Sequence, residues 1–398
     1  MKAVVTYGGL IGGRFGAALL QALSMVLLAR WAGPADFGLA VAVQSVILLV
    51  SAIAGMGLGP YVTRELAAGL AADEVRRVVR LNSLIGVILG AGLLAVFLAL
   101  APLDPRFWLM VPFALGAVAQ RNSAVWQGIT LARGRTRVFG LSLTLRRAVL
   151  LAVFVLMYAL GVNPVLSYAV AYVVAEAGVN ATLRAITPVG GSASNASMSR
   201  LLTLRLARPY WIETIATQLR NQDVAVVAFA AGPGAAGLFA VPSRVSSPAT
   251  MVGSAVSAVL LPKFASRGWS WFRRGLLLQL VTLAATGLGL VVIVALAGWL
   301  VPVIVGDEYL GAVQPLRIYC VGVFFLTFSM MAGAAIQGLG SARVVGHVAA
   351  VAATLVLGSV ALGAILGAAV GAAVGYSAAC FLQAVALVVL LVRLKARS

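Results

Sequence analysis

Acidic residues, cysteine and histidine are scarce in this chain, and their scarcity argues against several classes of protein. Only 10 of 398 residues are Asp or Glu, against 29 Lys or Arg, and charged residues of both signs make up 10%. A soluble domain carries roughly 25% charged residues, so this composition is not that of a soluble domain. The two cysteines, Cys320 and Cys380, and the single histidine, His347, argue against a disulfide framework or a metal site. We therefore expect no metal and no cofactor.

Long polar segments are also missing. The longest covers residues 188–207, which leaves no room for a large soluble catalytic domain. The sequence shows no nucleophile–base constellation and no phosphate-binding glycine loop, so we do not expect an enzyme or direct use of ATP. The pI of about 11.3 reflects basic loops beside anionic lipid headgroups, and we expect no nucleic acid partner.

The chain instead consists of apolar runs, which make up most of its length. A transmembrane helix needs about 20 apolar residues, and each run comes close to that length. The sequence therefore predicts an all-α integral membrane protein with twelve transmembrane helices. The runs cover residues 8–29, 37–60, 80–101, 107–131, 139–161, 164–187, 208–231, 235–261, 275–301, 312–338, 344–366 and 368–392.

Lysine and arginine are distributed unevenly between the loops. Of the 29, 20 lie in the two tails and in the loops that follow every second run, whereas the opposite loops hold only Arg30 and Arg106. Cytoplasmic loops of membrane proteins carry the excess of positive charge. We expect a multi-pass protein of the cytoplasmic (inner) membrane with both termini in the cytoplasm.

Two short motifs occur twice at matching places. Gly33-Pro34 joins the first two runs and Gly232-Pro233 joins the seventh and eighth, with an offset of 199 residues. Gln127-Gly128 and Gln337-Gly338 end the fourth and tenth runs, with an offset of 210 residues. The pattern predicts a parallel internal repeat of two six-helix bundles, residues 1–187 and 201–398, joined by a cytoplasmic linker at residues 188–200. Such an architecture favours alternating-access transport; duplication without transport is the alternative.

Seven arginines lie inside the predicted spans, where only three acids are available. A charge at the bilayer centre costs about 2.5–3.5 kcal/mol on insertion scales, so most of these side chains should face protein or water. The surplus of positive charge suits an anionic substrate, because the arginine fork matches phosphate geometry. The arginines are Arg14, Arg121, Arg146, Arg147, Arg220, Arg244 and Arg317, and the acids are Glu176, Glu213 and Asp223.

We assign these residues to two groups. Arg14, Arg147 and Arg244 are expected to line a cationic substrate cavity, with Pro242 and Pro248 breaking the helix around Arg244. For Arg121, a cavity role and a structural role are equally compatible with the pattern. For Arg317, a cavity role and a side chain that snorkels toward the outer surface are equally compatible.

The second group is a polar core. Arg220 and Asp223 are three residues apart and can pair, with Glu213 on the same helical stripe as Arg220. This pair either locks the helix to its neighbours or switches partners during transport. Glu176 has no local partner, so it either pairs with an intramembrane arginine or carries a coupling proton.

Several segments resemble the polysaccharide flippases of the multidrug/oligosaccharidyl-lipid/polysaccharide exporter superfamily. Residues 28–38 (LARWAGPADFG) are similar to the family's first hairpin, and residues 55–66 to its second span. Residues 306–312 (GDEYLGA) are similar to the Gly-x-x-Tyr-x-x-Ala segment before the tenth span. Asp223 and residues 261–264 (LPKF) resemble the matching part of the second half.

The resemblance implies a flippase that moves a polyprenyl-diphosphate-linked oligosaccharide from the inner to the outer leaflet for cell-surface polysaccharide biosynthesis. Its implied partners are that substrate and membrane lipids, together with a polysaccharide polymerase and glycosyltransferases, and one chain can act as a monomer. The chain lacks the two additional C-terminal helices of lipid II flippases. The alternatives are a cation-coupled multidrug exporter of the same superfamily and, in another class, an integral-membrane glycosyltransferase or polymerase, or a scaffold.

Overall fold

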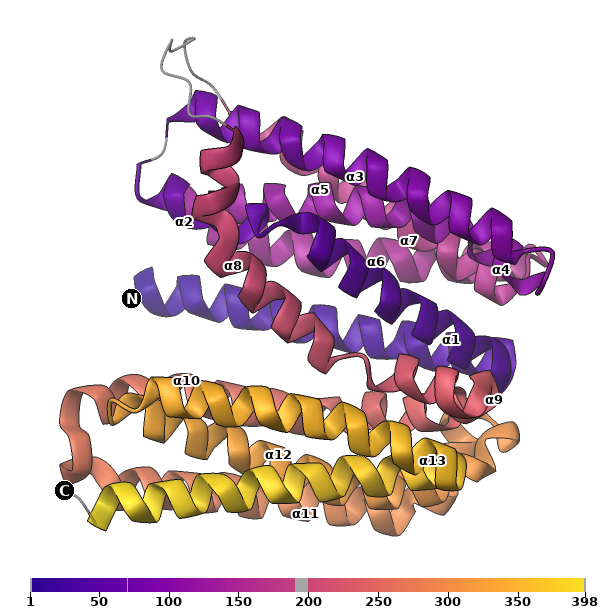
Figure 1. Ribbon diagram of the computed structural model, residues 1–398. Helices are drawn as coiled ribbons and strands as arrows, with labels where there is room; N and C mark the ends of the chain where they lie inside the picture. The colour runs from indigo at the N-terminus through magenta and orange to yellow at the C-terminus, as the bar shows by residue number, and fades with distance from the viewer. Residues whose placement is uncertain (1, 70, 190–199, 397–398) are drawn as a thin grey trace. The chain divides into compact units, whose positions relative to one another are not determined.

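The computed structural model describes residues 2–69, 71–189 and 200–396, without the side chains of residues 2–15, 200, 201, 216, 220, 342 and 343. Throughout these residues the regular secondary structure is helical (Figure 1). The α-helices are α1 (Lys2–Gly55), α2 (Leu58–Ala67), α3 (Ala72–Leu100), α4 (Arg106–Met110), α5 (Pro112–Ala132), α6 (Thr136–Ala159), α7 (Pro164–Ile186), α8 (Arg200–Arg220), α9 (Asp223–Val245), α10 (Ser247–Arg267), α11 (Phe272–Val305), α12 (Val313–Gly338) and α13 (Ala342–Ala396). Two short 3-10 helices, η1 (Gly268–Trp271) and η2 (Asp307–Ala312), precede α11 and α12.

Glycines divide the longest helices. Gly33 inside α1 and Gly232 inside α9 have φ of 73° and 85°, a left-handed conformation in which a Cβ is unfavourable. Each is followed by a proline, which has no N–H to continue the incoming helix. The turns predicted at the two Gly-Pro motifs are therefore confirmed. In α13 the helical backbone is interrupted at Gly367 and Ala368.

Four predicted runs are not continuous helices in the described residues. The runs at 37–60 and 107–131 are interrupted at Met56–Gly57 and at Val111. The run at 208–231 is interrupted between α8 and α9, at Asn221 and Gln222. The run at 235–261 is interrupted at Ser246, which confirms the break expected between Pro242 and Pro248.

Eight apolar helical stretches in the described residues are long enough to cross a membrane. Four of these stretches have 40 residues or more, about twice the length that one crossing needs. The protein is therefore a multi-pass, all-helical membrane protein, and the count of twelve spans stays a prediction. The four long stretches are Gly16–Gly55, Leu202–Val245, Ser247–Val305 and Val344–Ala396.

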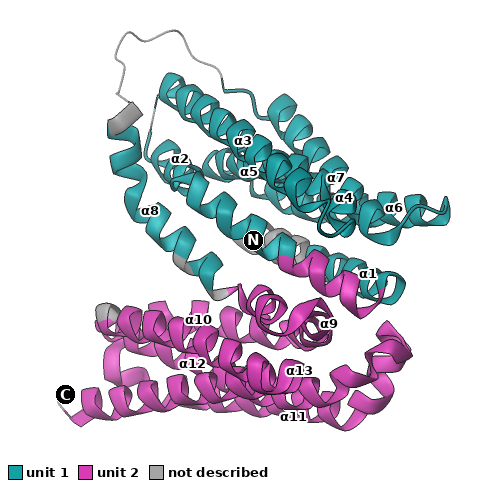
Figure 2. Cartoon of the chain, turned by 45° about the vertical axis from the view of Figure 1, so that its right-hand side comes forward, with its two compact units in different colours: residues 1–32, 43–219 teal, residues 33–42, 220–398 magenta. Residues whose placement is uncertain are grey.

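The helices pack into two compact units, coloured separately in Figure 2. Unit 1 contains residues 1–32 and 43–219, and unit 2 contains residues 33–42 and 220–398. The division into sequence halves at the 188–200 linker rests on the repeat and stays a prediction; residues 190–199 of that linker lie outside the described residues.

Unit 1 has an apolar core beside its second helix. Leu58, Tyr61 and Val62 of α2 pack with Ile129 of α5 and with Ala207 of α8. Gly128 lies against Thr63 so closely that a Cβ would not fit. The core therefore brings α8 into unit 1.

Unit 2 has a comparable contact between its own helices. Leu260 and Phe264 of α10 pack with Met331 and Ala335 of α12. Gly338, the counterpart of Gly128 in the predicted repeat, lies against Leu261 and Phe264 without space for a Cβ. Glycine is required at both positions because two helices approach closely there.

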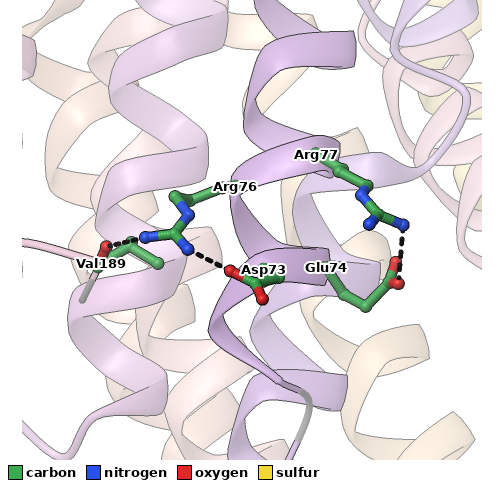
Figure 3. Close-up of polar contacts among 5 residues, drawn as sticks. All are labelled: Asp73, Glu74, Arg76, Arg77 and Val189. Atoms are coloured by element: carbon green, nitrogen blue, oxygen red, sulfur yellow. Dashed lines mark hydrogen bonds and ion pairs between the residues drawn. The ribbon is translucent and has the colours of Figure 1, made fainter. Parts of the chain in front are cut away.

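Opposite charges cluster at the start of α3, shown in Figure 3. Arg76 pairs with Asp73 and Arg77 pairs with Glu74, each three residues along the helix. Arg76 also donates from Nη1 to the carbonyl of Val189 at 3.4 Å. Acids in a first turn complement the helix dipole, so this cluster stabilises the beginning of α3 and ties the segment after α7 to it.

Candidate functional site

Arg121 lies inside unit 1 on α5 and is 7% exposed. Its Nη1 donates to the carbonyl oxygen of Ser51 at 3.0 Å, and its Nη2 donates to Oδ1 of Asn82 at 2.8 Å. Asn82 in turn donates to Asn122 at 3.3 Å. Every hydrogen-bond acceptor of Arg121 in the described residues is thus a neutral oxygen, and the positive charge is buried without a carboxylate partner.

Glu176 on α7 is 1% exposed and pairs with Arg146 of α6, whose Nη1 lies 3.1 Å from its Oε1. Ser123 of α5 donates to the second carboxylate oxygen at 2.5 Å. Of the two roles considered for Glu176, the ion pair with an intramembrane arginine is the one for which the structure provides contacts. Three helices of unit 1 meet at this carboxylate.

Arg147, the neighbour of Arg146, is half-buried and makes no hydrogen bond or ion pair with any described residue. Its charge is opposed by the neighbouring Arg146 and favoured by the carboxylate of Glu176. Because Glu176 is already held by Arg146 and Ser123, the Arg147 guanidinium keeps its donors available. This is what a side chain that binds an external anion requires.

Asp223 begins α9 in unit 2, and its Oδ1 accepts from the backbone N–H of Val224 at 2.9 Å. Its charge interacts with Arg244 at the other end of α9 and with Tyr319 of α12. Tyr319 stacks on Tyr376 of α13 with ring centroids 4.1 Å apart. Asp223 therefore interacts with a buried aromatic pair and, without direct contact, with the charge of an arginine.

The expected pair between Arg220 and Asp223 is not tested, because the side chain of Arg220 lies outside the described residues, as does that of Arg14. Arg244 and Arg317 are both exposed, and neither forms a hydrogen bond or ion pair through its side chain with a described residue. Both guanidinium groups are therefore available to bind an anion.

Glu213 is exposed on α8 and lines a cavity of about 350 Å³ in unit 1. The cavity lies between α2 and α8, and Tyr61, Arg64 and Tyr210 also line it. Arg64 donates to the hydroxyl of Tyr210 at 2.5 Å. Glu213 is thus placed beside a cation and two phenols of unit 1.

Sequence reasoning missed the contacts that hold α8 in unit 1. Nε1 of Trp211 donates to the carbonyl of Ile53 at 2.8 Å, just before the helix break at Met56 and Gly57. It also missed Asn82, Asn122 and Ser123 as partners of buried charges. Their polarity inside apolar runs is the signal that could have identified them, because buried polar groups need hydrogen-bond partners.

Comparison with known proteins assigns the chain to a family. A family model for polysaccharide biosynthesis proteins matches residues 8–267. No curated protein sequence matches the chain.

Solved structures show the same fold. The lipid II flippase MurJ in its inward closed conformation has a TM-score of 0.75 at 13% identity, over 96% of this chain and 87% of that chain. An inward-facing multidrug resistance MATE family transporter of the MOP superfamily has a TM-score of 0.74 at 17% identity, over 96% of both chains. A MOP superfamily transporter from Pyrococcus furiosus has a TM-score of 0.63 at 17% identity, over 97% of this chain and 94% of that chain. The fold is that of MOP superfamily transporters, and the chain belongs to the family of polysaccharide biosynthesis proteins.

Proposed function

We propose that the protein is a flippase that moves a polyprenyl-diphosphate-linked oligosaccharide from the inner to the outer leaflet. One observation carries the proposal beyond family membership. Five of the seven intramembrane arginines have described side chains, and only Arg146 among them forms an ion pair. The other four are Arg121, Arg147, Arg244 and Arg317, which leaves cationic groups in the membrane for an anionic substrate.

The chemistry of the substrate fits these groups. A diphosphate presents acceptor oxygens that a planar guanidinium can bind in pairs, and a low-dielectric surrounding strengthens the attraction. Arg147 is suited to this role because Arg146 already neutralises Glu176. Arg244 and Arg317 offer exposed guanidinium groups in the other unit. We assign phosphate binding to Arg147, Arg244 and Arg317, together with Arg14, and a role in positioning α5 to Arg121.

The proposed movement is alternating access between two six-helix bundles with twelve spans, residues 1–187 and 201–398. The supporting features are the paired Gly-Pro turns and the equivalent close contacts of Gly128 and Gly338. We place the protein in the inner membrane with both termini in the cytoplasm, on the distribution of lysine and arginine in the loops. Glycosyltransferases that build the lipid-linked glycan and a polymerase that consumes it are its proposed partners.

The test is translocation by the purified protein in lipid vesicles. A fluorescent polyprenyl-diphosphate oligosaccharide is incorporated, and its loss from the outer leaflet is followed with a membrane-impermeant quencher. We expect protein-dependent exchange that falls at least about 10-fold in Arg147→Ala, which corresponds to roughly 1.4 kcal/mol. Arg147→Lys should recover only part of the rate, because a point charge replaces a fork.

Arg184→Ala is the matched control, since Arg184 is an exposed arginine that lies over the ring of Trp126 rather than in the polar core. It should exchange substrate like the unmodified protein. Absence of exchange by the unmodified protein, with proton- or sodium-driven transport of a cationic dye in its place, would refute the flippase proposal and favour a multidrug exporter.

A further inference from the structure

Unit 2 contains a cavity of about 400 Å³ between α10, α12 and α13, here called the neutral cavity. Its polar lining comes from five side chains: Ser254, Ser257, Ser329, Gln337 and Gln383. Its volume lies within the range of about 300–1,000 Å³ that small-molecule sites occupy. It is separate from the arginines and acids described above, none of which lines it.

The hydrogen-bonding groups of the neutral cavity are partly committed and partly available. The hydroxyls of Ser254, Ser257 and Ser329 each donate at 2.8 Å to a carbonyl of their own helix. Each hydroxyl oxygen therefore keeps lone pairs that can accept a hydrogen bond. The side-chain amides of Gln337 and Gln383 make no hydrogen bond with a described residue, so they can both donate and accept.

None of the described residues that line the cavity carries a charge. A phosphate would find no cation there, and a cationic drug would find no carboxylate. The remaining lining is apolar or small, including Leu326, Met330 and Leu387, which suits the C–H faces of a sugar ring. An uncharged ligand with many hydroxyl groups matches this combination.

Comparison of the two repeats indicates why the neutral cavity of unit 2 lacks the charged groups found in unit 1. Gln337 corresponds to Gln127 at the offset of 210, and Gly333 on the cavity wall corresponds to Ser123. In unit 1, Ser123 donates to Glu176, which pairs with Arg146. Where unit 1 has a bound carboxylate, unit 2 therefore has a glycine beside a cavity.

The cavity lies toward one end of its helices. Gln337 is next to the last residue of α12, and Val345 and Val348 lie in the first two turns of α13. In the proposed topology this is the cytoplasmic end, where a lipid-linked glycan is loaded. We propose that the neutral cavity binds an uncharged sugar residue of the transported glycan. This inference rests on the proposed function, and it names a part of the substrate that the arginines do not recognise.

The experiment measures sugar binding without translocation. Saturation-transfer NMR on the full chain in lipid nanodiscs uses methyl glycosides of glucose, galactose and N-acetylglucosamine as probes, and glucose 1-phosphate as the charged comparison. We expect transfer to at least one neutral glycoside, and binding about fivefold weaker for each amide hydrogen bond removed in Gln337→Leu and Gln383→Leu. Gln314→Leu, an exposed glutamine at the other end of α12, should bind like the unmodified protein.

Each other outcome overturns the inference. No transfer to any neutral glycoside in the unmodified protein would do so, as would equal transfer in the Gln337→Leu/Gln383→Leu double variant. Preference for glucose 1-phosphate would contradict the neutral ligand class. A phospholipid retained by the unmodified protein in native mass spectrometry, and lost from the double variant, would assign the cavity to lipid instead. Loss of flipping in Arg147→Ala with sugar binding intact separates this test from that of the proposed function.

Discussion

Gly38 and Gly237 pack directly against each other, and neither position has room for a side chain. A Cβ on Gly38 would collide with the backbone of Gly237 and Pro233, and a Cβ on Gly237 would collide with the carbonyl of Pro34. The two glycines are 199 residues apart, at matching places after the two Gly-Pro turns. The two turns therefore meet backbone to backbone within unit 2.

This contact predicts that Gly38→Ala and Gly237→Ala each destabilise the protein by about 1–3 kcal/mol, the usual cost of overpacking. Backbone atoms cannot move aside as a flexible side chain can, so relief requires the turns to separate. Thermal unfolding in detergent measures the effect. Gly234→Ala is the control, because nothing lies within 4 Å of the Cβ it would add. Equal stability of all three variants would show that the turns separate freely.

The ion pair between Glu176 and Arg146 leads to a prediction for a double-mutant cycle. Glu176→Gln and Arg146→Gln should each cost about 3–5 kcal/mol, because each leaves a buried group without its partner. The double variant should recover much of the folded yield, since two glutamines can hydrogen-bond to each other. Arg317→Gln, which removes an exposed and unpaired arginine, should leave stability unchanged.

The two single variants, Glu176→Gln and Arg146→Gln, and the double variant also separate a structural role of Glu176 from a role in proton coupling. A structural pair predicts that the double variant still exchanges the lipid-linked substrate. A stably folded Glu176→Gln protein without transport, which the second substitution does not rescue, would instead assign proton coupling to Glu176.

Trp211→Phe should lower the midpoint of thermal unfolding by about 2 °C. The substitution keeps an aromatic ring but removes the Nε1–H that donates to Ile53, and one hydrogen bond contributes about 1 kcal/mol. Differential scanning fluorimetry of the purified protein checks this. Trp299→Phe, at a tryptophan that is 62% exposed, should have no effect. A larger loss in Trp299→Phe than in Trp211→Phe would argue that α8 is not held by this bond.

Orientation in the membrane is tested by single cysteines. We expect Arg135→Cys and Gly268→Cys to react with an impermeant maleimide only from the cytoplasmic side, and Asp104→Cys and Glu308→Cys only from outside. The native Cys320 and Cys380 are buried and should give little background. Labelling of Arg135→Cys from outside in intact cells would reverse the proposed topology.

The sequence predicted those features that depend on local chemistry. Gly33 and Gly232 turn the chain because glycine tolerates positive φ and the following proline cannot extend the incoming helix. Pro242 and Pro248 likewise predicted the break at Ser246. Motif spacing over the chain was sufficient to identify the family, which the family model confirms.

Features that depend on which helices meet could not be predicted in this way. The partner of Glu176 is 30 residues away on another helix, and no periodicity relates it to Arg146. The pair expected between Asp223 and Arg220 stays a prediction, but the interaction of the Asp223 charge with Arg244 and Tyr319 could not be predicted from sequence spacing. The break at Asn221 and Gln222 escaped detection because neither residue is a strong helix breaker.

The linker at residues 188–200 connects α7 to α8, and both helices pack in unit 1, which extends to Leu219. The N-terminal sequence half, expressed alone, would lack the helix that covers Leu58 and Tyr61, and the C-terminal half would display Ala207 and Trp211 without their contacts. The two halves should therefore be stable only when expressed together, as complementary fragments that reassemble around α8.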